Sequence, residues 1–184
     1  MTKREVKQTP FGEANFPFIQ EPDKEYNPEG IYQIKVIFKK DEVQQDIKII
    51  NDVISKVVAD EHLKQPGRTE QFKRAPLPYK ELDDGRVQIT FKSKFKPQIV
   101  DHNLETIPDD KKIWSGSIVR ISYEPSGYSM SSLGLGCKLY LKAVQIKKLV
   151  EGTAGDTGFS KVTPEQPETA NLVEFTNAKQ PIQL

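Results

Sequence analysis

The chain has 184 residues, which is the length of one domain with short terminal extensions. Its 36% hydrophobic and 29% charged residues are typical of a globular protein and exclude collagen, a coiled coil and a wholly disordered chain. The 27 basic and 26 acidic side chains give a net charge of +1, so the total charge does not by itself indicate a nucleic-acid partner.

The single cysteine, Cys137, excludes an intrachain disulfide and a cysteine-rich zinc site. No apolar run approaches the roughly 20 residues that a membrane span needs. The charged N-terminus is not followed by the apolar segment of a secretory signal. We therefore expect a protein of the reducing cytoplasm that has no membrane partner.

Closely spaced prolines and glycines interrupt residues 1–30, so we interpret this segment as an irregular lead-in in which 1–10 are flexible. Three large apolar side chains are expected to pack the lead-in onto the core: Phe11, Phe16 and Phe18. Apolar and polar side chains then alternate over 31–40, which predicts a half-buried strand.

Apolar side chains recur at helical spacing over residues 41–64, which predicts a single helix. Asp41 is a suitable N-cap because its carboxylate can accept hydrogen bonds from the first amides of the helix. Pro66 and Gly67 follow the last apolar position and are expected to end the helix.

Two segments rich in turn formers are predicted to be loops: 65–85 and 125–136. Around them, alternating side chains predict four further strands: 86–96, 98–101, 117–123 and 136–150. The alternation fails after Val144, which indicates a bulge or a sheet corner. By the same alternation, Phe91 and Phe95 are assigned to the core, and Trp114 is assigned to the core or to a sheet edge.

The composition changes from Glu151 onward to glycine, threonine, proline, glutamate and amide residues. Residues 151–184 contain five acidic and two basic side chains, a net charge of −3, which leaves +4 for 1–150. Such a polar segment buries too little apolar surface to fold alone. We predict one domain at 1–150, mainly β with one added helix, followed by a disordered, mildly acidic tail.

Few residues suggest catalysis. The only histidines, His62 and His102, have no cysteine or histidine at ligand spacing, and the sequence contains no glycine-rich phosphate loop. We therefore expect no catalytic residue, no metal and no cofactor. One alternative remains open, a metal-dependent nuclease that uses Asp23, Asp46 and Lys48, although the last two lie within the predicted helix.

Basic side chains repeat on the strand faces opposite the apolar positions. The candidate binding residues on the predicted strands are Lys35, Lys92, Lys94, Lys96, Arg120, Lys138, Tyr140 and Lys142. The two predicted loops add Phe72, Lys73, Arg74, Tyr79 and Tyr128. Tyr140 is the strongest stacking candidate because Lys138 and Lys142 flank it on the same face of one strand.

Binding of a single nucleic-acid strand without sequence preference requires cations for the phosphates and flat side chains for the bases. The strands supply both, and the loop at 65–85 could close over the groove between them. The same lysines would also suit the solvated face of an ordinary antiparallel sheet. The residues therefore predict a single-strand groove and leave a plain solvated face as the alternative.

Three stretches resemble a family of bacteriophage single-stranded DNA-binding proteins. They are Phe11-Gly-Glu-Ala-Asn-Phe-Pro-Phe-Ile-Gln-Glu-Pro-Asp23 with Glu29-Gly-Ile-Tyr32, Trp114-Ser-Gly-Ser-Ile-Val-Arg120, and Gly134-Leu-Gly-Cys-Lys-Leu-Tyr-Leu-Lys-Ala-Val-Gln-Ile146. Together they cover most of 11–150. The resemblance implies an OB-fold, a Greek-key β-barrel elaborated here by the helix, that coats single-stranded DNA during phage replication and recombination. It implies no catalysis and no metal, and it implies the cytoplasm of the infected bacterium.

The resemblance also implies partners and an assembly state. Replication proteins such as a polymerase, a helicase or recombination factors are the expected protein partners, and the expected state is a monomer or a homodimer. Better-known members of the wider group end in a strongly acidic tail with a terminal aromatic residue, whereas this chain ends at Leu184. An OB-like protein-interaction module of the replication machinery is the alternative function.

Overall fold

The structure is a computed structural model that describes residues 5–25 and 27–150. These residues belong to the first of the two units into which the chain divides, Met1–Gly152. The predicted tail at 151–184 lies outside the described residues. Within the described ranges, no helix has both the length and the apolar character needed to cross a membrane.

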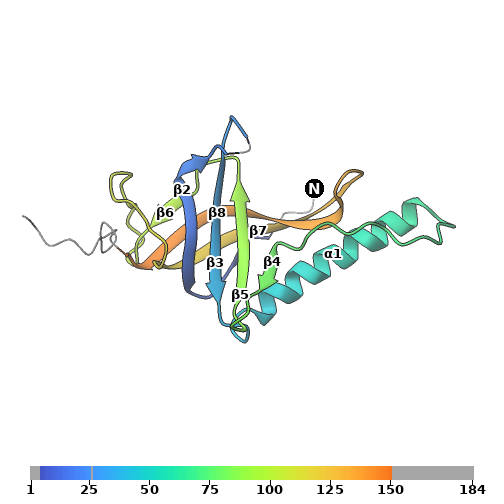
Figure 1. Ribbon diagram of the computed structural model, residues 1–184, viewed down its shortest axis with the longest axis horizontal. Helices are drawn as coiled ribbons and strands as arrows, with labels where there is room; N and C mark the ends of the chain where they lie inside the picture. The colour runs from blue at the N-terminus through green and yellow to red at the C-terminus, as the bar shows by residue number, and fades with distance from the viewer. Residues whose placement is uncertain (1–4, 26, 151–184) are drawn as a thin grey trace, which may run out of the picture. The chain divides into compact units, whose positions relative to one another are not determined.

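One helix and eight strands make up the described part of the chain (Figure 1). The strands are β1 (Lys7–Gln8), β2 (Gly12–Asp23), β3 (Ile31–Phe38), β4 (Tyr79–Glu81), β5 (Val87–Ser93), β6 (Gln98–Val100), β7 (Ile118–Met130) and β8 (Gly134–Lys148). The helix, α1 (Gln44–Lys64), comes between β3 and β4. The strands predicted at 31–40 and 98–101 and the predicted end of the helix are confirmed.

Five of the strands close into a barrel. β2 pairs with β3, β3 with β5, β5 with β8, β8 with β7, and β7 returns to β2. Within this ring only β5 and β8 are parallel. β1, β4 and β6 add to the outside of the ring by pairing with β7, β5 and β8. A five-stranded Greek-key barrel is the OB architecture, so the predicted fold class is confirmed.

Alternate side chains of the barrel strands fill the core, and the helix covers one side of it. The largest fully buried side chains are Phe38, Phe91 and Tyr123, which come from β3, β5 and β7. Figure 1 shows α1 running along the hairpin formed by β7 and β8. A methyl group at Gly127 of this hairpin would collide with Val57 of the helix, so glycine is needed for the close approach.

The helix begins later than predicted. Its first residue is Gln44, its N-cap is Val43, and no side chain caps it, so the assignment of Asp41 as the N-cap is wrong. Residues 41–43 instead form a turn in which the Glu42 N–H donates to the Lys39 carbonyl oxygen at 3.1 Å. Burial of Val43 in the core fixes where the chain enters the helix.

Strand β2 runs through the segment that was interpreted as an irregular lead-in, so that interpretation is wrong. β1 also lies within 1–10, part of the segment expected to be flexible. The register of β2 with β3 shifts between Asn15 and Phe18 and again between Phe18 and Asp23. Pro17 and Pro22 fall in these two irregular stretches. Because proline cannot donate to a ladder, it is tolerated at such bulges.

The predicted loop at 125–136 is also wrong, because β7 and β8 continue through it as a hairpin. Gly134 starts β8 with a φ of +102°, a conformation that other residues rarely adopt. Part of the predicted loop at 65–85 is the short strand β4, which pairs with β5. In both segments glycine and proline mark tight local geometry within the sheet rather than irregular chain.

Strand β8 contains the predicted irregularity and a second one. The register with β7 shifts at Lys147, where the failed alternation after Val144 predicts an irregularity. It also shifts at Lys142, which was not predicted. The shift at Lys142 exchanges the two faces of the strand. Val144 and Ile146 are therefore buried, and Ala143 is only half-buried.

A buried polar contact joins the helix to the barrel. The Tyr123 O–H of β7 donates to Asp46 Oδ1 of α1 at 2.6 Å, and the two residues are 0% and 5% exposed. Burial raises the pKa of the Asp46 carboxyl, and the hydrogen bond from Tyr123 opposes that rise. Burial and the same hydrogen bond raise the pKa of the Tyr123 phenol.

Replacing Tyr123 with phenylalanine should destabilise the protein. Tyr123→Phe removes the donor and leaves the buried Asp46 carboxyl without it, which costs about 1–3 kcal/mol of unfolding free energy. Urea unfolding followed by circular dichroism measures this loss. An unchanged unfolding free energy would show that the contact does not hold the helix on the barrel.

The pH dependence of stability should change in Asp46→Asn. Because the folded-state pKa of Asp46 is raised, the folded state binds its proton more tightly than the unfolded state does. This residue's contribution to stability therefore falls as the pH rises from its ordinary value, about 4, through the raised value. The variant lacks this fall, so it should gain stability relative to the parent over that range. A difference independent of pH between the two proteins would contradict the assignment.

Candidate nucleic-acid interface

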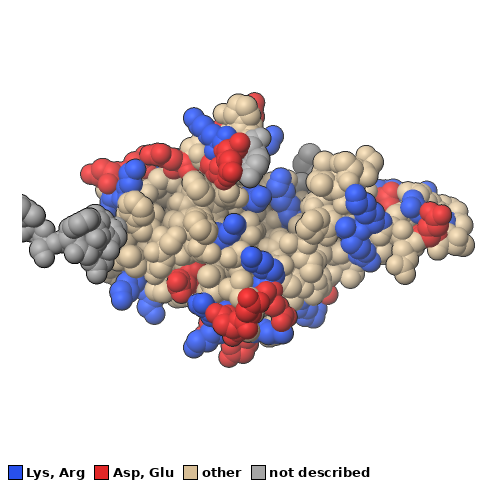
Figure 2. Space-filling model, in the orientation of Figure 1, with Lys and Arg blue, Asp and Glu red and all other residues tan. Residues whose placement is uncertain are grey.

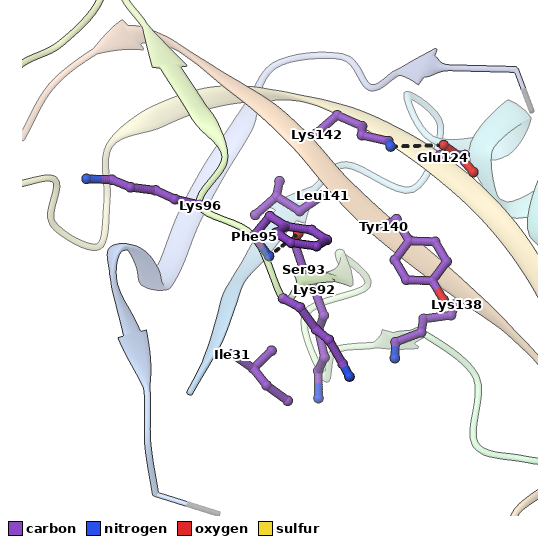
Figure 3. A pocket seen from close by; sticks show the side chains of 11 residues that line it. Ile31, Lys92, Ser93, Phe95, Lys96, Glu124, Lys138, Tyr140, Leu141 and Lys142 are labelled. Carbon is purple, nitrogen blue, oxygen red and sulfur yellow. Dashed lines mark hydrogen bonds and ion pairs between the residues drawn. The ribbon is translucent and has the colours of Figure 1, made fainter. Parts of the chain in front are cut away.

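A groove of about 420 Å³ lies on the outer surface of the barrel, where the end of β5, the segment after it and the middle of β8 meet. Eleven residues line it: Ile31, Lys92, Ser93, Lys94, Phe95, Lys96, Glu124, Lys138, Tyr140, Leu141 and Lys142. The structure thus brings together six of the predicted site residues, five lysines and Tyr140. Figure 3 shows these side chains, and Lys92, Lys138 and Tyr140 lie close together in it.

The outward position of Tyr140 follows from the burial of its neighbours on β8. Leu139 and Leu141 are each 2% exposed, so the alternate residues Lys138 and Tyr140 must point away from the core. Tyr140 pairs with Lys92 across the parallel β5–β8 contact, which places the two side chains on the same face. The Lys138 ammonium lies 5.5 Å from the centroid of the Tyr140 ring.

Phe95 lies in the groove and not in the core, so its assignment to the core is wrong. β5 ends at Ser93 instead of continuing to Lys96, and alternation no longer governs the residues after it. The Ser93 hydroxyl accepts a hydrogen bond from the Phe95 N–H at 3.0 Å and turns the chain outward. The Phe95 side chain is 81% exposed, whereas Phe91, within the strand, is fully buried as predicted.

The lysines of the groove differ in what they contact. Lys142 forms an ion pair with Glu124 at 3.1 Å, and Lys96 forms one with Asp109 at 2.6 Å. Figure 3 shows Lys142 directed toward Glu124 and Lys96 directed away from Tyr140. Three other lysines, Lys92, Lys94 and Lys138, are exposed and form no ion pair with any residue in the described ranges. These three therefore offer the charge that a phosphate would meet.

Lys35 lies on the same sheet face, two strands from Tyr140. Its register partners are Thr90 on β5 and Asn15 on β2, and the neighbouring outer residue Gln33 pairs with Lys92. Figure 2 shows basic side chains over β5 and β8, while acidic side chains gather where β3 ends and β5 begins and beside β2 and β6. The basic face therefore extends from β8 across β5 to β3.

Arg120 does not reach the groove. Its guanidinium donates to Gln145 Oε1 at 2.5 and 3.2 Å and lies 4.8 Å from the centroid of the Phe11 ring. Arg120 lines a different hollow together with Gln8 and Leu104. The Arg120 side chain lies on the outer face of its strand, as predicted. Closure of the barrel, however, places it near β1 and β6, away from Tyr140.

The predicted loop residues lie along α1 and the β7–β8 hairpin. Phe72 and Lys73 line a pocket near the tip of the hairpin, where the Arg68 guanidinium lies 4.5 Å from the Phe72 ring centroid. Arg74 forms an isolated bridge with Leu135. The structure does not bring this segment over the groove that contains Tyr140.

Tyr79 and Tyr128, the two predicted site tyrosines outside the groove, serve packing. Tyr79 packs against the core from β4, and its O–H donates to Asn51 Oδ1 at 3.4 Å. Tyr128 stands opposite Gly136 in the hairpin, where a methyl group on the glycine would lie 2.7 Å from the tyrosine ring. Neither residue lines the groove.

The three residues of the nuclease alternative have separate partners. Asp46 accepts the buried hydrogen bond from Tyr123, and Lys48 forms an ion pair with Asp52 on the exposed side of α1. Asp23 accepts a hydrogen bond from Gln33 Nε2 at 2.6 Å at the end of β2. Among the described residues, no three histidine, cysteine or acidic side chains gather in a way that could hold a metal ion.

Sequence reasoning missed some exposed aromatic side chains besides Phe95. Phe16, Phe18 and Trp114 are 59%, 39% and 50% exposed, so Phe16 and Phe18 do not bind the lead-in to the core and Trp114 is not a core residue. A signal for Phe95 exists in the sequence, because Lys94 and Lys96 flank it directly. Aromatic residues bracketed by lysines therefore mark both ring positions in the groove.

Solved structures of two bacteriophage proteins share the fold of this chain. In the solved structures, the chain is similar to gp2.5, a single-stranded DNA-binding protein encoded by bacteriophage T7, with 21% identity, a TM-score of 0.69 and coverage of 83% of this chain and 91% of that one. It is also similar to the single-stranded DNA-binding protein of bacteriophage Enc34 in complex with single-stranded DNA, with 20% identity, a TM-score of 0.62 and coverage of 79% and 88%. A comparison with curated proteins found no match.

The sequence profile of one protein family matches most of the chain. The match extends over residues 13–161. It includes all five strands of the barrel and lacks only Gly12, the first residue of β2. The profile is described as the single-stranded DNA-binding protein of Enterobacter phage Enc34. This match shows that the chain belongs to the phage Enc34 single-stranded DNA-binding protein family.

Proposed function

We propose that this protein binds single-stranded DNA without sequence preference and coats it during phage replication and recombination. Membership of the family and the OB barrel support this function. The observation that carries it is the groove in which the rings of Tyr140 and Phe95 lie among the exposed ammonium groups of Lys92, Lys94 and Lys138. Rings of this kind stack on bases of any sequence, and the ammonium groups neutralise phosphates.

The proposed function is one of binding, with no chemical step. The buried contact of Asp46 with Tyr123 assigns that carboxylate a structural role, and the groove contains one acidic residue, Glu124, which forms an ion pair with Lys142. The protein acts in the cytoplasm of the infected bacterium as a monomer or a homodimer. Its domain comprises residues 1–150, and polymerase, helicase or recombination factors are its protein partners.

The direct test is fluorescence anisotropy with one labelled oligonucleotide in single- and double-stranded form, measured over a series of salt concentrations. Single-stranded DNA should bind preferentially, and log K should fall by about 0.7 per phosphate contact for each log unit of salt. The oligonucleotide should remain intact after incubation with Mg²⁺. If neither form binds at low salt, the function is a different one, and a protein-interaction module becomes the better account.

The salt dependence should identify the lysines that contact phosphate. Lys138→Ala should lower the slope of log K against log salt by about 0.7, the value for one phosphate contact. Lys56→Ala is the matched control, because Lys56 is exposed on α1 outside the groove. Equal slopes for the two variants would place the DNA elsewhere on the protein.

Loss of the Tyr140 ring should weaken binding more than loss of any single charge on an exposed lysine. Tyr140→Ala should cost about 1–3 kcal/mol of binding free energy, because a stacked base loses its platform. Leu63→Ala, at an 80% exposed position of α1, is the control for removal of a surface side chain. An unchanged affinity in folded Tyr140→Ala would show that the groove does not hold the bases.

A further inference from the structure

Three aromatic residues outside the groove form a second exposed cluster. Phe16, Phe18 and Trp114 line a hollow of about 430 Å³ between β2 and the segment before β7. Their side chains are 59%, 39% and 50% exposed. These rings are not part of the hydrophobic core, and they do not line the groove that contains Tyr140.

The cluster is built into the backbone of β2. Phe16 has a φ of +47°, a left-handed conformation that a bulky residue rarely adopts, within the bulge between Asn15 and Phe18. Its N–H donates to Ser115 Oγ at 3.0 Å, next to Trp114 in the chain. Strained residues of this kind persist where the surrounding structure holds them, and they concentrate at binding sites.

Two further hydrogen bonds fix the segment that carries Trp114. Gln20 of β2 accepts a hydrogen bond from the Ile113 N–H at 3.0 Å and donates one to the Lys111 carbonyl oxygen at 2.9 Å. These bonds hold the segment with Trp114 against β2, the strand that carries Phe16 and Phe18. The backbone that carries the three rings is therefore fixed by contacts within the protein.

The sheet register connects the cluster to the groove. Tyr140 pairs with Lys92, Lys92 with Gln33, and Lys35, two residues further along β3, with Asn15 of β2. Directly paired residues share a face of the sheet, so this row crosses β8, β5, β3 and β2 on one outer surface. At the end of the row, the Lys35 ammonium lies 5.6 Å from the centroid of the Phe16 ring.

The charges beside the hollow favour a nucleic-acid strand over an apolar protein segment. Lys35 stands next to the rings, and Lys112 lines the hollow. Two acidic residues are also present, but Glu21 lies 3.9 Å from Lys112 in an exposed ion pair, and Asp109 is paired with Lys96 at 2.6 Å. Exposed rings with basic side chains beside them match the pattern by which proteins hold unpaired bases.

We propose that Phe16, Phe18 and Trp114 form a second base-stacking subsite for the same DNA strand that occupies the Tyr140 groove. This inference rests on the proposed function and extends it. The strand leaves the groove along Lys92 and Lys35, crosses β3 and stacks a further base on the cluster. Short oligonucleotides fill the groove alone, and longer ones reach both subsites.

Trp114 reports on this subsite directly because it is the chain's only tryptophan. The full chain is titrated with oligothymidylates of about 4 to 16 nucleotides, the range of OB-fold site sizes. Anisotropy of a labelled oligonucleotide records binding, and tryptophan fluorescence records stacking on Trp114. Short oligonucleotides should bind with little change in the tryptophan signal, and above a threshold length the signal should be quenched.

The double variant Phe16→Ala/Phe18→Ala keeps Trp114 and removes its neighbours. Its affinity should fall about 5- to 150-fold for each stacked base lost, only for oligonucleotides above the threshold length. Leu63→Ala should bind all lengths as the parent does. Circular dichroism of the double variant verifies folding, and the fluorescence titration of the parent chain stands even if that variant does not fold.

The outcomes separate this inference from the proposed function. DNA binding by anisotropy without tryptophan quenching at any length overturns the second subsite and leaves the groove as the DNA site. Equal affinity of the parent and the folded double variant for long oligonucleotides also overturns it, and it would assign the cluster to a protein partner. Absence of binding at every length contradicts the proposed function itself.

Discussion

The burial of one face of β8 is the constraint on which the interface depends. Leu139 and Leu141 fill the barrel core, and a strand whose side chains alternate must then present Lys138 and Tyr140 on the other side. The bulge at Lys142 limits this arrangement to the middle of the strand, because beyond it Val144 and Ile146 take the core positions. The hydrophobic core thus sets the position of the stacking ring, and the ring does not depend on a loop conformation.

Local periodicity predicted the elements whose burial is regular, namely β3, β5 and α1, and the part of β8 before its bulge at Lys142. It failed for β2, since Pro17 and Pro22 interrupt the pattern and are tolerated only because the β2–β3 register shifts around them. It also failed at the β7–β8 hairpin, where Gly127 is required by its contact with Val57 of α1 and Gly136 by its contact with Tyr128 on the paired strand. Such contacts exist only in the folded chain, so no reading of a single segment could have found them.

The same distinction explains what could be predicted of the site. Tyr140 and its lysines were found because alternation assigns a face, and that face is fixed by the core. Arg120 has an outward position too, but alternation does not say which part of a closed barrel a face belongs to, and closure places Arg120 beside Phe11. Phe95 was assigned to the core because the end of β5 at Ser93 depends on a hydrogen bond that the alternating pattern does not contain.

The most direct test of the account is to map where the DNA lies on the protein. A single-stranded oligonucleotide containing 5-iodouracil is photo-crosslinked to the full chain, and the crosslinked residues are identified by mass spectrometry. The account predicts crosslinks at Tyr140 and Phe95, the rings that lie in the groove among the exposed lysines. Crosslinks confined to Phe11 near Arg120, or to Phe72 beside the hairpin, would contradict it.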